Sequence, residues 1–265
     1  MSLVEQNIQC VSIPRSGHHL LINLLFRYYS GDPNFPINDG TSRSWSFKEP
    51  VQAGDFYYCE YYKCCQSIPC SKAPANCQKN HDFDLDLEIN SSYRYIVQYR
   101  HPLSYLVSFY NWRFLHGEIY GKDVKDSKDI WLEFIGRKPS FTGDDCFISC
   151  IKNYILWVKQ SIGIYPPEKL QYWKSFIKKW IIDNNNSNAY VINYDDLINR
   201  PDAILKEVIH FISPSADIDE RMINHIINGM EIKNRSDYKT FKYYDQKLFC
   251  KFERFVKNEM KLLSI

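Results

Sequence analysis

Three short apolar runs along the chain predict buried strands, and helical spacing follows each of them. The runs are Cys10 to Ile13, Arg94 to Tyr99 and Ala189 to Asn193. Apolar side chains then recur every three or four positions, which is typical of a helix with one buried face. After the first two runs these side chains are Leu20, Leu21, Leu24 and Leu25, then Leu103, Leu106, Val107 and Tyr110. Strands that alternate with helices predict an α/β fold with a central parallel sheet flanked by helices.

The segments between these runs contain no repeat, no low-complexity tract and no convincing linker. Gly31 to Ser46 is rich in Gly, Pro, Asn, Asp and Ser and predicts a loop. Residues 147–182 have helical spacing, with an interruption at Gly163. The 265 residues are enough for one large domain or two small ones. Because nothing marks a boundary, we predict a single domain over residues 1–265.

The balance of charges limits the classes of partner. Lysine and arginine nearly equal aspartate and glutamate in number, and the net charge is +2. Bulk attraction to nucleic acid or to an anionic membrane is therefore not indicated, and any anion site must be local. No apolar run is long enough for a membrane-spanning helix, and the first residues lack the apolar region of a signal peptide. We expect a cytoplasmic protein with no membrane span and no nucleic-acid partner, whose oligomeric state is unknown.

The turn after the first predicted strand is the strongest candidate for an anion site. It reads Pro14-Arg15-Ser16-Gly17 and leads directly into the first predicted helix. In such a turn the loop amides and the free N–H groups of the first helical turn converge on one point and attract an anion. Gly17 allows close approach of the backbone, and Arg15 adds charged donors. The alternative is an ordinary turn with a surface arginine.

This turn is P-loop-like but lacks the G-x-x-x-x-G-K-[ST] pattern of nucleotide triphosphatases, so ATP hydrolysis is disfavoured.

A second candidate anion site follows the second predicted strand. Arg100 ends that strand, and Ser108 lies two turns along the next helix. Two such elements side by side predict a ligand with two anionic ends. The alternative is that Arg100 caps the sheet and Ser108 packs.

Taken together, these motifs resemble the two nucleotide signatures of the sulfotransferases that use 3′-phosphoadenosine 5′-phosphosulfate (PAPS). A third fragment, Tyr194-Asp195-Asp196-Leu197, is similar to a segment of the same family. The resemblance implies that the first turn holds the 5′-phosphosulfate and that Arg100 and Ser108 hold the 3′-phosphate. It also implies that Tyr194 lies near the adenine. PAPS would be the co-substrate, 3′-phosphoadenosine 5′-phosphate (PAP) the product, and no metal would be required.

Two parts of the predicted nucleotide site depart from the family pattern or match it weakly. His18, His19 and Leu20 stand where the family usually has two hydroxyl residues and, in many members, a tryptophan that stacks on adenine. Imidazole can also donate a hydrogen bond, so we still expect these residues to line the phosphate site. Near the C-terminus, Arg235 is the best match to a basic residue that completes the 3′-phosphate pocket. A solvated charge cluster is the alternative for Arg235.

The resemblance also offers two candidates for the catalytic base. Lys79-Asn80-His81 is similar to a stretch that carries the base in many members, which assigns His81 as the base and Lys79 as a ligand of the sulfuryl group. A neutral imidazole suits the removal of a proton from an attacking hydroxyl. Other branches use a glutamate, for which Glu49 is the candidate. The alternatives are a surface histidine in a polar turn, a metal ligand beside Cys77, and a solvated lysine–glutamate pair at Glu49.

The acceptor and the crowded cysteines are less well defined. Five cysteines lie between Cys59 and Cys77 without C-x2-C spacing, which favours free thiols over local disulfides or a metal site. This segment is expected to wall the acceptor pocket. The aromatic content of 16% suits phenol, glycan and lipid acceptors alike, with a hydroxyl or an amine as the accepting group. Two other classes stay open: a nucleotide-phosphate kinase with a degenerate P-loop, and a non-catalytic PAP-binding or cysteine-cluster interaction module.

Overall fold

The computed structural model describes the greater part of the chain, with several gaps. The described residues are 7–35, 51–60, 70–71, 76–82, 84–115, 128, 173, 175–184, 188–230, 232, 237–246, 250, 253–254, 257–258 and 261. Their elements, in chain order, are β1 (Ile8–Ser12), α1 (His18–Ser30), β2 (Val51–Ala53), β3 (Phe56–Glu60), β4 (Cys77–Asn80), β5 (Arg94–Tyr99), α2 (Pro102–Leu115), η1 (Lys178–Ile182), β6 (Ala189–Asn193), α6 (Tyr194–Asn199), α7 (Pro201–Ile212), α8 (Glu220–Asn228) and η2 (Tyr238–Thr240). In the described ranges, no helix combines the length and the apolar character that crossing a membrane requires.

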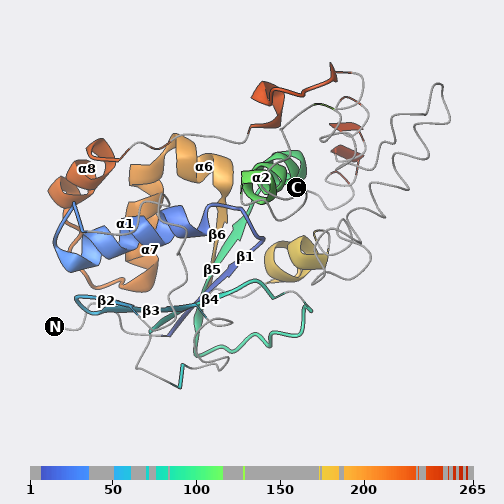
Figure 1. Cartoon of the computed structure of the whole chain (residues 1–265). Coiled ribbons are helices and arrows are strands. Elements are labelled where there is room, and N and C mark those ends of the chain that lie inside the picture. The colour runs from blue at the N-terminus through green and yellow to red at the C-terminus, as the bar shows by residue number, and fades with distance from the viewer. Residues whose placement is uncertain are drawn as a thin grey trace, which may run out of the picture. The chain divides into compact units, whose positions relative to one another are not determined.

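The six strands form one sheet in the order β2-β3-β4-β1-β5-β6 (Figure 1). All neighbouring pairs are parallel except β2 with β3, which forms an antiparallel hairpin at one edge. The inner strands β1 and β5 are almost entirely buried, as expected where both faces of a strand are covered. The predicted α/β fold with a mostly parallel sheet is confirmed, as are the predicted strands at β1, β5 and β6.

The chain divides into two compact units. The first contains residues 1–82, 86–100 and 184–234, and its described part holds the sheet and the helices α1, α6, α7 and α8. The second contains residues 83–85, 101–183 and 235–265, with α2, η1 and η2. The single domain over residues 1–265 stays a prediction.

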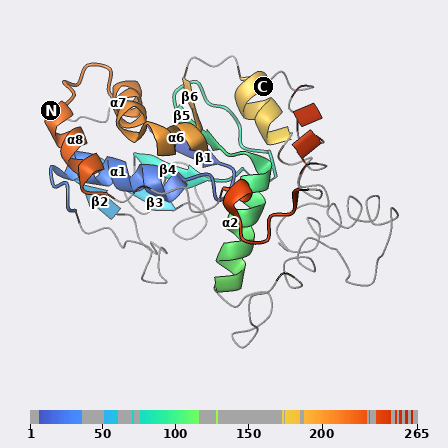
Figure 2. The ribbon, with the colours of Figure 1, turned by 90° about the horizontal axis from the view of Figure 1, so that it is seen from above.

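In the first unit, α1, α6, α7 and α8 lie over one face of the sheet (Figure 2). Their apolar stripes face the strands and form one continuous core. On α7, the buried positions recur every three or four residues after Pro201, whose missing N–H suits the first turn. In the same core the thiols of Cys10 and Cys77, on neighbouring strands, lie 3.4 Å apart, and both are free. This core holds the carboxyl ends of the strands, where the candidate residues lie, in fixed positions.

In the second unit, α2 begins at Pro102 as the sequence predicts. Leu103 and Val107 are buried, in agreement with the predicted apolar face, and Ser108 is buried as well. The ring of His101, just before the helix, stacks on Tyr238 with 5.2 Å between ring centroids. Aromatic stacking therefore links the start of α2 to η2.

Candidate active site

The turn between β1 and α1 is tight and is held from within. The hydroxyl of Ser16 donates to the carbonyl of Ile13 and, over 3.2 Å, to the carbonyl of Gln98 on β5. The Ser16 amide also donates to Ile13. Arg15 and Gly17 have φ values of 65° and 85°, in the left-handed region. The loop conformation is therefore fixed by its own hydrogen bonds, at the cost of one strained residue, Arg15.

The start of α1 has the properties of an anion site. Gly17, the N-cap, provides no side-chain hydrogen bond to the helix, and the first helical turn contains no acidic residue. The N–H groups of that turn therefore keep their capacity to donate, and the positive end of the helix dipole adds to it. The side chain of Arg15 is exposed beside them. The charge and donor set suit an anionic ligand, and the phosphate-binding role of this turn stays a prediction.

The second predicted anion element is joined to the first. Arg100 follows β5 and is only 1% exposed. Its Nη1 donates to the carbonyl of Arg15 over 3.3 Å, and its guanidinium lies 3.8 Å from the centroid of the Tyr194 ring. The structure thus brings Arg15, Arg100 and Tyr194 together, although the sequence motifs are far apart. Ser108 lies in the second unit, and its place beside Arg100 stays a prediction.

Tyr194 has a structural role that the sequence did not reveal. It opens α6, whose N-cap Asn193 accepts a hydrogen bond from the Asp195 amide over 3.0 Å. Because Arg100 covers one face of the ring, that face is not available for stacking on adenine. A Cβ added at Gly17 would lie 2.6 Å from Cδ2 of the same ring. Tyr194 therefore packs closely against the first turn and also supports Arg100.

Replacing Gly17 by alanine should damage this arrangement. The variant combines an unfavourable φ of 85° with a clash against Tyr194, and it should lower the free energy of unfolding by about 1–3 kcal/mol. Gly31→Ala is the matched control, because Gly31 has a φ of 70° and nothing within 4 Å of an added Cβ. Urea unfolding would compare the two. Equal losses in both variants would mean that the contact with Tyr194 carries no energy.

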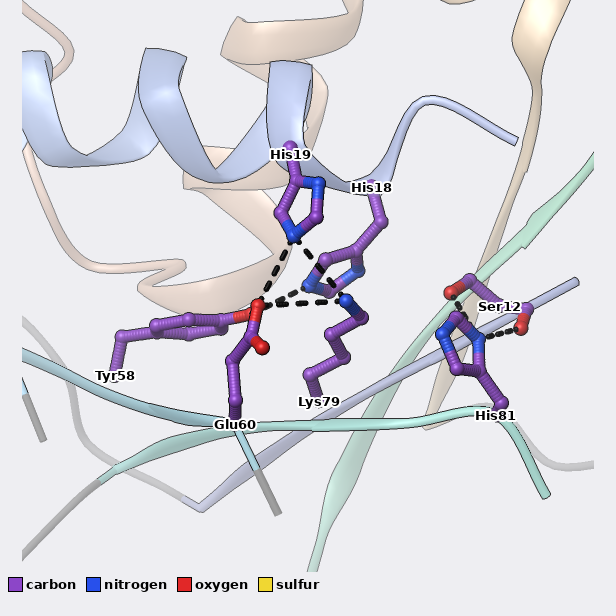
Figure 3. Close-up of polar contacts among 7 residues, drawn as sticks. All are labelled: Ser12, His18, His19, Tyr58, Glu60, Lys79 and His81. Carbon is purple, nitrogen blue, oxygen red and sulfur yellow. Dashed lines mark hydrogen bonds and ion pairs between the residues drawn. The ribbon is translucent and has the colours of Figure 1, made fainter. Parts of the chain in front are cut away.

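His81 lies one residue beyond β4 and is oriented by the end of β1 (Figure 3). Its Nδ1 is 2.6 Å from the carbonyl oxygen of Ser12 and 3.2 Å from the Ser12 hydroxyl. A carbonyl oxygen can only accept, so Nδ1 must carry the proton and Nε2 is the basic atom. Burial, followed by the nearby Lys79 ammonium, lowers the pKa of His81 to about 3. The ring is therefore neutral at pH 7, the form that a general base requires.

Five residues, all buried except the partly exposed His19, form a polar cluster beside the first turn, here called the Glu60 cluster (Figure 3). Its members are His18 and His19 from α1, Tyr58 and Glu60 from β3, and Lys79 from β4. Three donors converge on Oε1 of Glu60: His19 Nε2 at 3.0 Å, Lys79 Nζ at 3.4 Å and the Tyr58 hydroxyl at 3.4 Å. The sequence had assigned His18, His19 and Lys79 to the site, but Tyr58 and Glu60 were missed.

The two histidines of this cluster turn their Nε2 atoms toward β3. His18 Nε2 is 2.9 Å from the Tyr58 hydroxyl, and His19 Nε2 faces Glu60. Burial, followed by Lys79, lowers the pKa of His18 well below its usual value and that of His19 to about 4. Both rings are therefore neutral at pH 7. Their part in phosphate binding stays a prediction.

Three other residues were assigned to the site from the sequence: Leu20, Glu49 and Arg235. Leu20 is partly buried and packs against the core of the first unit. Glu49 and Arg235 lie outside the described residues, so their roles stay predictions. Within the ranges that are described, no group of three or more His, Cys, Asp or Glu side chains is placed to hold a metal ion.

Comparison with known proteins bears on the fold. No family model and no curated protein matches the chain. Among solved structures, the chain is similar to retinol dehydratase in a complex with retinol and PAP. The two share 12% sequence identity and a TM-score of 0.52, over 96% of this chain and 81% of that chain. At this identity the likeness shows the fold alone, an α/β fold with a mostly parallel sheet flanked by helices.

Proposed function

We propose that this chain transfers a sulfuryl group from PAPS to a hydroxyl group of an acceptor. The observation that carries the proposal is the position of His81. Its basic Nε2 belongs to a ring held by the last residue of β1, the strand that leads into the anion-binding turn. A base and an anion site at the carboxyl ends of adjacent parallel strands are what a group transfer to a hydroxyl requires.

In the proposed reaction the acceptor oxygen attacks sulfur, and its proton passes to Nε2 of His81. The new O–S bond forms as the bond between sulfur and the phosphate oxygen breaks, and PAP leaves with the electron pair of that bond. The exposed Arg15 guanidinium, the amides at the start of α1 and the Lys79 ammonium stabilise the negative charge that develops. None of these groups changes its protonation state, so His81 is the only proton acceptor in the scheme.

The acceptor is proposed at the level of a class. The structurally similar retinol dehydratase carries retinol, a small-molecule alcohol, together with PAP. This supports a small-molecule or glycan hydroxyl for the present chain, and a phenol or lipid hydroxyl is compatible with it. An acceptor screen with PAPS labelled in its sulfate would identify the class directly.

Calorimetry with PAP and with ATP tests the nucleotide part of the proposal. PAP should bind without added Mg²⁺, and more tightly than ATP. Preference for ATP with a requirement for Mg²⁺ would instead indicate the nucleotide-phosphate kinase. PAP binding without transfer in the acceptor screen would indicate a binding module.

Replacing Arg100 by alanine should weaken PAP binding about 10- to 100-fold, the usual worth of a hydrogen bond to a charged partner, and change kcat much less. Arg94→Ala is the matched control. Arg94 is at the opposite end of β5, where it donates to the carbonyls of Phe211 and Ile212, so its loss should reduce stability without altering PAP affinity. Calorimetry and thermal unfolding of both variants separate the two effects. A PAP affinity that Arg100→Ala leaves unchanged would contradict the assignment.

A further inference from the structure

Glu60 is a carboxylate in an unusual position for its charge. It ends β3 and its side chain is completely buried. A buried carboxylate is strongly unfavourable unless charged or polar donors compensate it. Here the compensation comes from separate elements: His19 on α1, Lys79 on β4, and Tyr58 two residues earlier on β3. Packing alone does not explain why a buried carboxylate stands at the end of a strand that borders the candidate site.

The ammonium of Lys79 is held at one place by this carboxylate. Glu60 and Lys79 are register partners on the adjacent parallel strands β3 and β4, which sets their side chains next to each other. Lys79 Nζ is 3.4 Å from Glu60 Oε1 and 3.2 Å from His19 Nε2, and its side chain is 4% exposed. A long lysine side chain that is buried and paired with a carboxylate loses the freedom it has at a surface. The charge therefore has a defined position when a ligand arrives.

The same carboxylate also sets the charge balance of the site. Arg15 and Lys79 are cations close to the first turn, and Arg100 contacts the turn through the Arg15 carbonyl. The negative charge of Glu60 offsets one of these cations. In a buried setting that charge acts over several ångströms with little screening. An anion at the first turn is consequently held less tightly than three cations alone would hold it.

We propose that Glu60 is a positioning residue for sulfuryl transfer, with two effects of opposite sign on the enzyme. It fixes the Lys79 ammonium where that charge stabilises the transition state, which raises kcat. It also lowers the net positive charge around the product, which weakens PAP binding and speeds release. The inference rests on the proposed sulfotransferase function and adds a residue that the family resemblance does not contain.

The charge-neutral variant Glu60→Gln separates the two effects. It keeps the size of the side chain and removes its charge, so PAP should bind about three- to tenfold more tightly. The kcat should fall about tenfold or more, because Lys79 is no longer held in place. A variant that only disturbed the structure would weaken PAP binding together with kcat.

Glu207→Gln is the matched control for Glu60→Gln. Glu207 is also bonded to a tyrosine hydroxyl, that of Tyr190, and paired with a cation, Arg200, but it lies on the exposed surface of α7. This variant should leave both PAP affinity and kcat at the wild-type values. A Glu60→Gln protein whose PAP affinity equals that of Glu207→Gln, or is weaker, would overturn the proposal.

Two further variants keep the test decisive if Glu60→Gln folds poorly. Glu60→Asp keeps the charge and shortens the side chain, so it should lower kcat and leave PAP affinity unchanged. The double variant Glu60→Gln with Lys79→Met removes both charges and restores neutrality, so PAP affinity should return to the wild-type value while kcat stays low. Wild-type kcat in Glu60→Asp would also overturn the proposal, because positioning would then be unimportant.

A measurement without nucleotide distinguishes failure of this inference from failure of the proposed function. The 3.0 Å contact to Glu60 keeps the ring proton of His19 on Nε2, which ¹⁵N spectra of the histidine ring report. Wild type should show that tautomer. If wild type shows the tautomer but binds no PAP, the proposed function fails while the cluster stands. If wild type binds PAP but lacks the tautomer, the positioning role of Glu60 fails alone.

Discussion

Replacing His81 by alanine is expected to lower kcat about 10²- to 10⁴-fold, the usual contribution of a positioned general base. PAP affinity should stay at its wild-type value, because the ring is assigned to the acceptor proton and not to the nucleotide. The expected loss of kcat follows from the orientation of the ring. Nδ1 donates to the Ser12 carbonyl over 2.6 Å, so Nε2 is the proton acceptor. Steady-state kinetics with an acceptor from the screen, together with PAP calorimetry, would measure both quantities.

The control for this experiment is His225→Ala. His225 is exposed on α8 and lies far along the chain from the site residues, so its removal should change neither kcat nor PAP affinity. Full turnover in His81→Ala would refute the assignment of the base. In that case Glu49, the other candidate from the sequence, would be the next residue to replace.

The pH dependence of wild type gives an independent check on His81. Burial and Lys79 lower the pKa of this histidine to about 3, so the basic form persists far below the range in which a free imidazole becomes protonated, about pH 6.5. The acid limb of kcat/KM that His81 controls should therefore lie well below pH 6.5, and activity should not fall between about pH 8 and about pH 6 through this group. An acid limb centred near pH 6.5 would mean that the base is a solvated histidine.

The sequence predicted one half of the sheet, β1, β5 and β6, and missed the other half. The runs that predicted β1, β5 and β6 are largely apolar and four to six residues long, so they are recognisable by composition alone. The missed strands β2, β3 and β4 have three to five residues and include polar side chains such as Gln52, Glu60 and Lys79. A short strand with polar residues has no distinctive pattern, and its place in a parallel sheet depends on contacts that are distant in the sequence.

The candidate site was likewise only partly predictable from the sequence. The joining of Arg15 to Arg100 was foreseeable, because each arginine follows a central strand and the carboxyl ends of neighbouring parallel strands meet. Glu60 was not recognised, although Phe56, Tyr58 and Glu60 alternate along one short run and would share a face of a strand. That alternation was the only local signal. The pairing of Glu60 with Lys79 depends on the register of β3 with β4, which no local pattern encodes.

Replacing Arg15 by alanine should lower kcat about 10²- to 10³-fold, the loss typical when one preorganised charge donor is removed from a transition state. The side chain of Arg15 is exposed beside the start of α1, where the amides also converge. The backbone of Arg15 has a φ of 65°, and alanine shares the same steric penalty there, so the variant tests the guanidinium and not the strain. The carbonyl that accepts from Arg100 remains in place.

Arg15→Lys is the matched variant for this test, because it keeps both the charge and the backbone penalty. It should recover much of the turnover that alanine loses, although an ammonium cannot form the two parallel hydrogen bonds of a guanidinium. Arg221→Ala, on the exposed side of α8, should behave as wild type. If alanine at position 15 left turnover intact while Arg100→Ala still weakened PAP binding, the nucleotide would bind at this edge of the sheet, but its sulfuryl group would not lie at the first turn. Loss of turnover in alanine and recovery in lysine would place the developing charge beside Arg15, as the geometry of the turn requires.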